Sequence, residues 1–357
     1  MTTVAIEIND IGLEAAAESG LVGTPSPGYV LLDRRRIIAG EAARSQARLR
    51  PRFVSHRHWD LLSRVSAGRP FPRGLTQADL VHAHLSQYWA GLLETLGTTT
   101  ARTSVLLAVP ACYSVDQLSL LLGITRAADI PVTGLVDSAL AAMAGASIDR
   151  PILHLDIRLH RSVWTVFEVR EGEISRTGAE SVESAGLQSF RAAWVRLIAE
   201  HFVRETRLDP LHQGASEQRL YDQLDGWAGT VEQAGTAPIS IGTGEQDRTV
   251  EISSEQLAAA AEPVLEALVG PVEGLLVDRE GSVVHISSRL AGIPGLCRRL
   301  AETTGSDPVQ LAGGAAARGA LERRQSIEAP GSSLRLITDL TTRPTATLER
   351  PVFGPHG

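Results

Sequence analysis

Alternating apolar and polar positions predict a pair of strands near the middle of the chain. Over residues 151–160 the two kinds of residue alternate with a period of two, which places one set on each face of a strand. The apolar set is Leu153, Leu155, Ile157 and Leu159. A returning strand follows at 163–169, and a similar strand–turn–strand pattern over 4–8 and 13–17 opens the chain. Two such hairpins far apart in the sequence predict a pseudo-symmetric pair of α/β lobes.

Other patterns predict the elements between and after these hairpins. Residues 104–109 form a continuous apolar run, typical of a central strand covered on both faces. Apolar residues at helical spacing predict amphipathic helices at 76–96 and 186–205. A capping box begins a helix predicted over 253–268. The apolar residues between 334 and 340 indicate either an added strand or a tail that docks on a partner.

Composition narrows the function classes. With 357 residues and 43% hydrophobic content, the chain can bury a large core in two lobes. A net charge of −7 argues against a nucleic-acid partner. There is no apolar leader and no apolar run of membrane-spanning length, so we expect a cytoplasmic protein that does not bind membranes. All 34 basic residues are arginines, which excludes a catalytic lysine because Arg does not deprotonate.

Several motifs follow one another in a recognisable order. They are Gly40-Glu41-Ala42-Ala43 at a helix start, a strand ending in Val109-Pro110-Ala111, the glycine-led helix at 184–210, an Ile-Pro helix at 283–302, and the small-residue helix at 307–321. In this order they resemble the ATPase domain of the heat shock protein 70 family, within the actin-like ATPase superfamily. The resemblance covers roughly residues 3–322.

The resemblance implies a fold and a domain organisation. The fold is α/β, a two-lobed actin-like ATPase (ribonuclease H-like) fold in which each lobe is a mixed sheet with flanking helices. The first lobe would span 1–147 with a helical insertion at about 34–100, and the second 148–322 with an insertion at about 190–252. The remaining residues, 323–357, form a tail too short to be the substrate-binding domain of a chaperone.

The resemblance also implies where a nucleotide would bind. The family holds Mg²⁺ and triphosphate between two glycine-rich turns, because only a residue without Cβ lets the backbone approach phosphate so closely. The matching segments here are 7–11 and 156–161, and neither contains glycine. Glu7 and Asp156 are the positions implied for the Mg²⁺ shell. Ser138 matches the family's water-ordering glutamate, and His56 matches its phosphate-contacting lysine.

Two interpretations of this cleft remain open. The implied contacts to ATP or ADP are Asn9, Asp10, Arg158, His160, Arg161, Ser287, Ser288, Gly313 and Gly314. Large side chains in place of glycine favour an occluded or rebuilt cleft, in which Asp156 and Arg158 neutralise each other. We expect Arg158 and His160 to lie in the phosphate position and to pair with nearby carboxylates. Alternatively, the guanidinium groups hold an anion in place of backbone amides.

Three functional hypotheses follow. The favoured one is a non-hydrolysing binding or scaffold module whose partner is another protein, a pseudo-ATPase. The second is an ATP-binding regulator with weak hydrolysis, and the third a stand-alone chaperone-like ATPase. No residue is assigned as catalytic, and a metal is expected only if Mg²⁺ accompanies a nucleotide.

Overall fold

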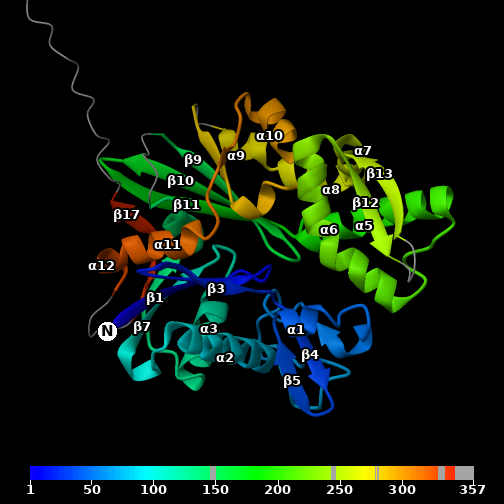
Figure 1. Ribbon diagram of the computed structural model, residues 1–357. Coiled ribbons are helices and arrows are strands. Elements are labelled where there is room, and N and C mark those ends of the chain that lie inside the picture. Colours follow the sequence, from blue (N-terminus) through cyan, green and yellow to red (C-terminus); the bar gives the residue numbers. More distant parts are fainter. Residues whose placement is uncertain (145–149, 243–246, 278, 280, 329–333, 342–357) are drawn as a thin grey trace, which may run out of the picture.

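The computed structural model describes residues 1–144, 150–242, 247–277, 279, 281–328 and 334–341 (Figure 1). Over these residues the chain is a mixed α/β protein, in which helices flank several β-sheets. The expected lobe boundary at residues 147–148 and residues 342–357 of the expected tail lie outside the described residues.

The first six-stranded sheet contains the N-terminal hairpin and has the order β16-β8-β7-β1-β2-β3. Its strands are β1 (Thr2–Glu7), β2 (Leu13–Ala17), β3 (Gly20–Ser26), β7 (Thr103–Val109), β8 (Val132–Asp137) and β16 (Leu336–Ile337). β1 is antiparallel to β2 and parallel to β7. Every residue of β7 is buried, which confirms the central strand predicted from its apolar run.

The second six-stranded sheet contains the central hairpin and has the order β15-β14-β9-β10-β11-β17. Its strands are β9 (Ile152–Ile157), β10 (Ser162–Arg170), β11 (Glu173–Val182), β14 (Val283–Ile286), β15 (Val309–Gln310) and β17 (Asp339–Thr341). Five of them, β9, β10, β11, β14 and β15, have the same order and relative directions as β1, β2, β3, β7 and β8. The chain therefore repeats one sheet topology, with β1 and β9 in equivalent positions.

Two short helices lie between the large sheets: α4 (Ser138–Ala142) and α11 (Ala315–Glu322). They share an apolar cluster with residues of both sheets, among them Leu106 and Phe167. A Cβ at Gly319 would lie 1.9 Å from the carbonyl oxygen of Ala141, so the two helices approach this closely only because α11 has glycine there. Figure 1 shows α11 between the sheets.

The remaining helices include two that pack on the first sheet. α2 (Gln77–Leu96) and α3 (Val115–Ala127) pack on the first sheet, and α2 begins with a capping box between Thr76 and Asp79. The others are α1 (Glu41–Arg44), α5 (Leu187–Thr206), α6 (Gly214–Ala234), α7 (Ser254–Ala260), α8 (Glu262–Val269), α9 (Val272–Leu276), α10 (Leu296–Thr304) and α12 (Arg324–Ile327). Among the described helices, none is both long and apolar enough to cross a membrane.

Two small sheets complete the fold. One has three strands, β4 (Val30–Asp33), β5 (Arg36–Ala39) and β6 (Val54–Ser55), and the other is the hairpin of β12 (Thr236–Gly242) and β13 (Asp247–Ser253). The hairpin packs with α5, α6 and α7 in the apolar cluster that also covers one face of the second sheet.

The last described segment confirms an added strand and extends that prediction. β16 pairs with β8 in the first sheet, and β17, which begins two residues after β16 ends, pairs with β11 in the second. The segment 336–341 therefore joins the edges of both large sheets.

One predicted helix differs from the structure. The helix predicted over 253–268 is divided into α7 and α8 at Ala261. Pro263 follows two residues later, and because proline has no backbone N–H it is tolerated in the first turn of a helix but not in its interior.

Candidate functional site

The turns that follow β1 and β9 contact each other, as the sequence predicted. The Asn9 side-chain amide donates to Asp156 Oδ2 and to the carbonyl of Ile157, both at 3.0 Å. The backbone N–H of Leu159 donates to Asp10 Oδ1 at 2.9 Å. Asn9 and Asp10 are fully buried, so these two implied nucleotide contacts instead join the turns to each other.

Arg158 lies between the turns and is 1% exposed. Its guanidinium donates to the carbonyl of Ile8 at 3.1 Å and to the Tyr113 hydroxyl at 3.4 Å, and Nε is 3.7 Å from Asp10 Oδ1. Burial opposes the charged form, but the attraction of Asp10 together with smaller contributions from Tyr113 and other neighbours outweighs it, so the pKa of Arg158 is raised. The expected pairing of Arg158 with a carboxylate is confirmed for Asp10.

Asp156 is not the hydrogen-bond partner of Arg158, although its charge is among those that raise the pKa of Arg158. β9 ends at Ile157, so Arg158 belongs to the turn and is turned toward the first sheet. Asp156 instead accepts from Asn9 and lies 3.7 Å from Arg289.

Arg289 is a site residue that sequence reasoning missed. It lies in the short 3-10 helix Ser288–Leu290 that follows β14. Its guanidinium donates to both oxygens of Glu7, at 2.8 and 3.0 Å, and to Glu14 at 3.2 Å. Burial raises the pKa of Glu7, while Arg289 acts to lower it. Both carboxylates implied for Mg²⁺ therefore face an internal cation.

Six of the implied site residues line one small cavity: Glu7, Ser138, Asp156, Ser287, Ser288 and Gly314. Arg289 also lines it, and only about 20 Å³ remains for solvent. That is room for about one water molecule. Three buried atoms at this cavity have no hydrogen-bond partner among the described residues: His154 Nδ1, His154 Nε2 and Ser287 Oγ. A water molecule in the cavity would form hydrogen bonds with some of them.

Gly313, another implied residue, does not line this cavity. Gly313 lies next to Gly314, and a Cβ there would be 3.9 Å from Ser288 Oγ. Ser138 opens α4, whose N-cap Asp137 bonds to Arg176 at 2.6 Å.

His160 and Arg161 contact residues 56–60 and make no hydrogen bond to Glu7, Asp10 or Asp156. His160 Nε2 is 3.0 Å from both Nδ1 and the carbonyl oxygen of His56, so the expected pairing of His160 with a carboxylate is wrong. Arg161 donates to Asp60 at 2.7 Å and to Glu183 at 3.3 Å. A Cβ at Gly186 would lie 2.3 Å from the carbonyl carbon of His160, so glycine allows α5 to begin against this turn.

Burial and the neighbouring His160 lower the pKa of His56 to about 4. His56 is therefore neutral at pH 7 and does not supply the positive charge of the lysine it matches.

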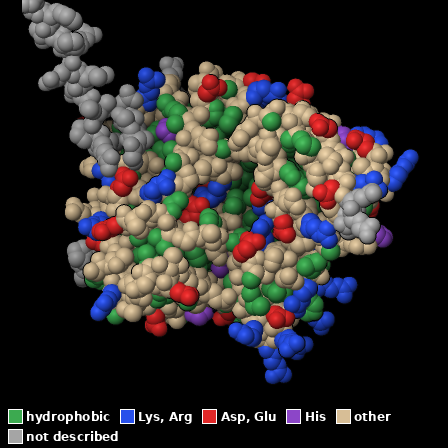
Figure 2. Space-filling view, viewed as in Figure 1, with side chains coloured by type: hydrophobic (Ala, Val, Ile, Leu, Met, Phe, Trp, Pro, Cys, Tyr) green, Lys and Arg blue, Asp and Glu red, His purple; other side chains and the backbone are tan. Residues whose placement is uncertain are grey.

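Residues of the segment 29–48 also contact helices α5 and α6. Gln218 on α6 accepts from the backbone N–H of Arg48 at 2.7 Å and donates to the carbonyl of Arg44 at 3.1 Å. Gln188 and Arg191 on α5 both donate to the Tyr29 hydroxyl. Tyr29, Arg191 and Gln218 also line a cavity of about 100 Å³. In Figure 2, acidic and basic side chains lie close together around the central hollow of this face.

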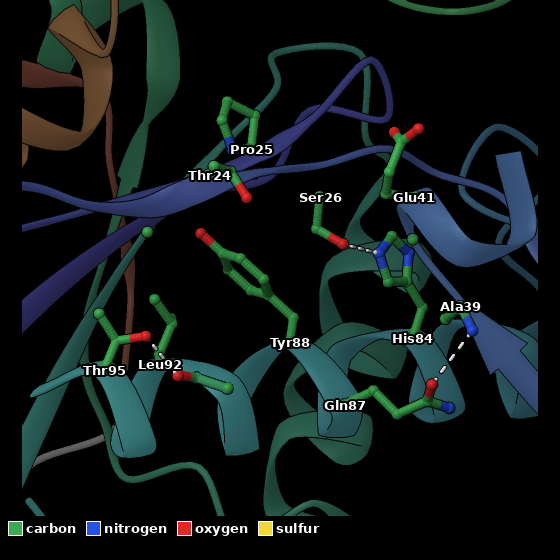
Figure 3. Close-up of a pocket in the computed structure, with 13 residues that line it drawn as sticks. Thr24, Pro25, Ser26, Ala39, Glu41, His84, Gln87, Tyr88, Leu92 and Thr95 are labelled. Atoms are coloured by element: carbon green, nitrogen blue, oxygen red, sulfur yellow. Dashed lines mark hydrogen bonds between the residues drawn. The ribbon is translucent and has the colours of Figure 1, made fainter. Parts of the chain in front are cut away.

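A separate cavity of about 260 Å³ lies between β3, β5 and α2 (Figure 3). The Trp59 indole donates to His84 Nδ1, which leaves the proton of the neutral ring on Nε2 to donate to Ser26. Burial lowers the pKa of His84 to about 3, consistent with a neutral imidazole. The Tyr88 hydroxyl has no partner among the described residues.

Comparison with known proteins adds no assignment. No protein-family model matches the sequence, and no curated protein matches it. The functional argument therefore rests on the geometry of the site.

Proposed function

We propose that this chain is a degenerate member of the heat shock protein 70-like, actin-like ATPase fold that acts as a non-hydrolysing binding or scaffold module for a cytoplasmic protein partner. The repeated sheet topology supports the two-lobed fold, since the turns after β1 and β9 meet where such a fold would bind its ligand. The observation that carries the functional proposal is that the buried Arg158 and the partly buried Arg289 pair with the carboxylates where the proposed fold would hold its ligand.

Charge explains why these arginines oppose nucleotide binding. Mg²⁺ would have to compete with Arg289 for Glu7 and Asp156. Displacing Arg289 from Glu7 would leave a nearly fully buried carboxylate without its partner, at a cost of about 3–5 kcal/mol. The nucleotide would also need far more than the roughly 20 Å³ that the cavity provides.

The sequence also argues against catalysis of ATP hydrolysis. Neither turn has the glycines that aim backbone N–H groups at phosphate, and the chain has no lysine. Each lost donor to the transition state costs about a hundredfold or more in rate. The alternative, an ATP-binding regulator, needs free cations at Arg158, His160 and Arg161, and all three have partners within the protein.

The test is calorimetric titration with ATP and ADP, each with and without Mg²⁺, together with a phosphate-release assay. We expect no magnesium-dependent binding and no turnover above background. Asp156→Asn is the control for a contaminating ATPase, because a contaminant's activity would persist in this variant. Steady phosphate release that Asp156→Asn abolishes would contradict the proposal.

A further inference from the structure

The cavity of about 100 Å³ above the turns is lined mainly by hydrogen-bond donors. On one side it is bounded by Tyr29, Arg48 and His56, and on the other by Arg191 of α5 and Tyr221 of α6. It has room for several water molecules, and therefore for a compact group such as phosphate or carboxylate.

The hydrogen bonds already made leave further donors unused. Tyr29 Oη accepts from Gln188 and from Arg191, which leaves its own proton free to donate. His160 Nε2 lies against both the carbonyl and Nδ1 of His56, so the geometry puts the proton of His160 on Nε2 and that of His56 on its own Nε2. Neither Tyr29 nor His56 needs an acceptor from the protein to hold its position.

Arg48 contributes the most available cation. Its guanidinium lies over the Tyr221 ring, 3.6 Å from the centroid, and 3.3 Å from Glu217, but it makes no side-chain hydrogen bond to any residue the structure describes. Arg191 is 6% exposed and uses three of its five N–H groups, two on Asp225 and one on Tyr29. The guanidinium is thus fixed by Asp225 with two donors left over.

Carboxylates offset part of this charge. Asp222 lines the cavity and lies 3.9 Å from Arg44, while Glu41, Glu217 and Asp225 pair with Arg44, Arg48 and Arg191 from outside the lining. The lining itself therefore has three arginines and one carboxylate. Burial and His160 lower the pKa of His56 most, and the nearby Arg48 and Arg191 lower it further.

We propose that this cavity binds a compact oxyanion, a phosphate or carboxylate group, between Arg48 and Arg191, with Tyr29, His56 and Tyr221 as neutral donors. Guanidinium groups favour such ligands because their N–H geometry matches two oxygens at once. The ligand would contact the segment before β6 and helices α5 and α6 together, so binding would stabilise the closed contact between them.

The experiment uses the full chain and inorganic phosphate as the probe. We expect saturable binding in calorimetry that does not require Mg²⁺, and a rise in the pKa of His56, followed by NMR, because a bound anion stabilises the imidazolium. Arg48→Gln should weaken phosphate binding about tenfold or more. Arg50→Gln is the matched control, since Arg50 has similar exposure but pairs with Asp33 outside the cavity.

Two additions keep the test decisive. Tyr221→Phe preserves the ring under Arg48 and removes one donor, so it should weaken binding less than Arg48→Gln without the risk of misfolding. Parallel titrations with succinate and glycerol phosphate distinguish a carboxylate from a phosphate ester as the preferred source. Absence of binding up to about 10 mM in all three titrations, or equal weakening by Arg48→Gln and Arg50→Gln, would overturn the proposal.

This proposal is independent of the proposed function. ATP binding that needs Mg²⁺ and survives Arg48→Gln would refute the occluded cleft and leave the anion site standing. Magnesium-independent phosphate binding that Arg48→Gln removes would support the anion site without bearing on hydrolysis.

Discussion

At the residue scale, Arg158 forms a buried ion pair with Asp10, and this makes its removal costly. The group is buried with Asp10, so Arg158→Met would leave a buried carboxylate without its cation. We expect a loss of about 3–5 kcal/mol in the free energy of unfolding, measured by urea denaturation.

The double variant Arg158→Met with Asp10→Asn separates charge from packing. Asparagine keeps a side-chain oxygen for the Leu159 N–H but removes the unpaired charge. The double variant should therefore be more stable than Arg158→Met alone. If the loss of stability in the double variant equals the sum of the losses in Arg158→Met and Asp10→Asn, Arg158 and Asp10 are not coupled.

Single residues also show how far the sequence could predict the site. The absence of glycine from both turns can be read directly from the sequence. It correctly indicated that Arg158 would pair with a carboxylate. Arg289 could not be found this way, because it contacts Glu7 across 282 residues and only the placement of the 3-10 helix after β14 brings them together. The predicted partner of Asp156 was wrong because strand alternation ends at Ile157 and does not extend into the turn at Arg158.

At the scale of elements, Gln218 holds α6 against the segment that contains Arg44 and Arg48. Gln218→Ala removes two hydrogen bonds to backbone groups, worth about 1–3 kcal/mol together. We expect faster hydrogen–deuterium exchange across residues 44–53 in this variant, without global unfolding.

Gln87 provides a matched control for this prediction. It makes the same pair of contacts on α2, accepting from the backbone N–H of Ala39 and donating to the carbonyl of Ile37. Gln87→Ala should leave exchange at 44–53 unchanged and raise it near β5. Equal exchange at 44–53 in the two variants would mean that Gln218 does not hold the cleft closed.

Elements were predicted well where one periodic pattern dominates. β7, β9 and β10 follow directly from apolar runs or alternation, and α2 and α5 from helical spacing. The split between α7 and α8 was not predicted because the helical spacing was continued across Pro263. The two-sheet pairing of 336–341 was not predicted because the choice of a partner strand depends on tertiary packing.

For the whole molecule, buried neutral histidines make stability depend on pH. Burial lowers the pKa of His56 and of His154 to about 4 and that of His84 to about 3, and it lowers the pKa of His58 well below its usual value. Below pH 6.5 these groups take up protons in the unfolded chain but stay neutral in the folded one. The stability of the folded state that depends on these neutral histidines is therefore present above about pH 6.5 and is lost as pH falls toward 4.

Two carboxyls act in the opposite direction. Burial raises the pKa of Glu7 and of Asp137, so folding favours their protonated forms and gains stability as pH falls. The four histidines outnumber them, and each contributes up to about 1.4 kcal/mol per pH unit. We therefore expect the urea midpoint to fall clearly between about pH 7 and pH 5.

His154 isolates the contribution of one histidine. Neither ring nitrogen has a partner among the described residues, so His154→Leu removes a titrating group without breaking a hydrogen bond. Its free energy of unfolding should vary less with pH than that of the wild type, by about 1.4 kcal/mol per pH unit below pH 6. His212→Gln, at an exposed position, should leave the pH dependence unchanged. If the wild type and His154→Leu lose stability in parallel on acidification, His154 is not the cause, and the other buried histidines or the ion-paired carboxylates must be.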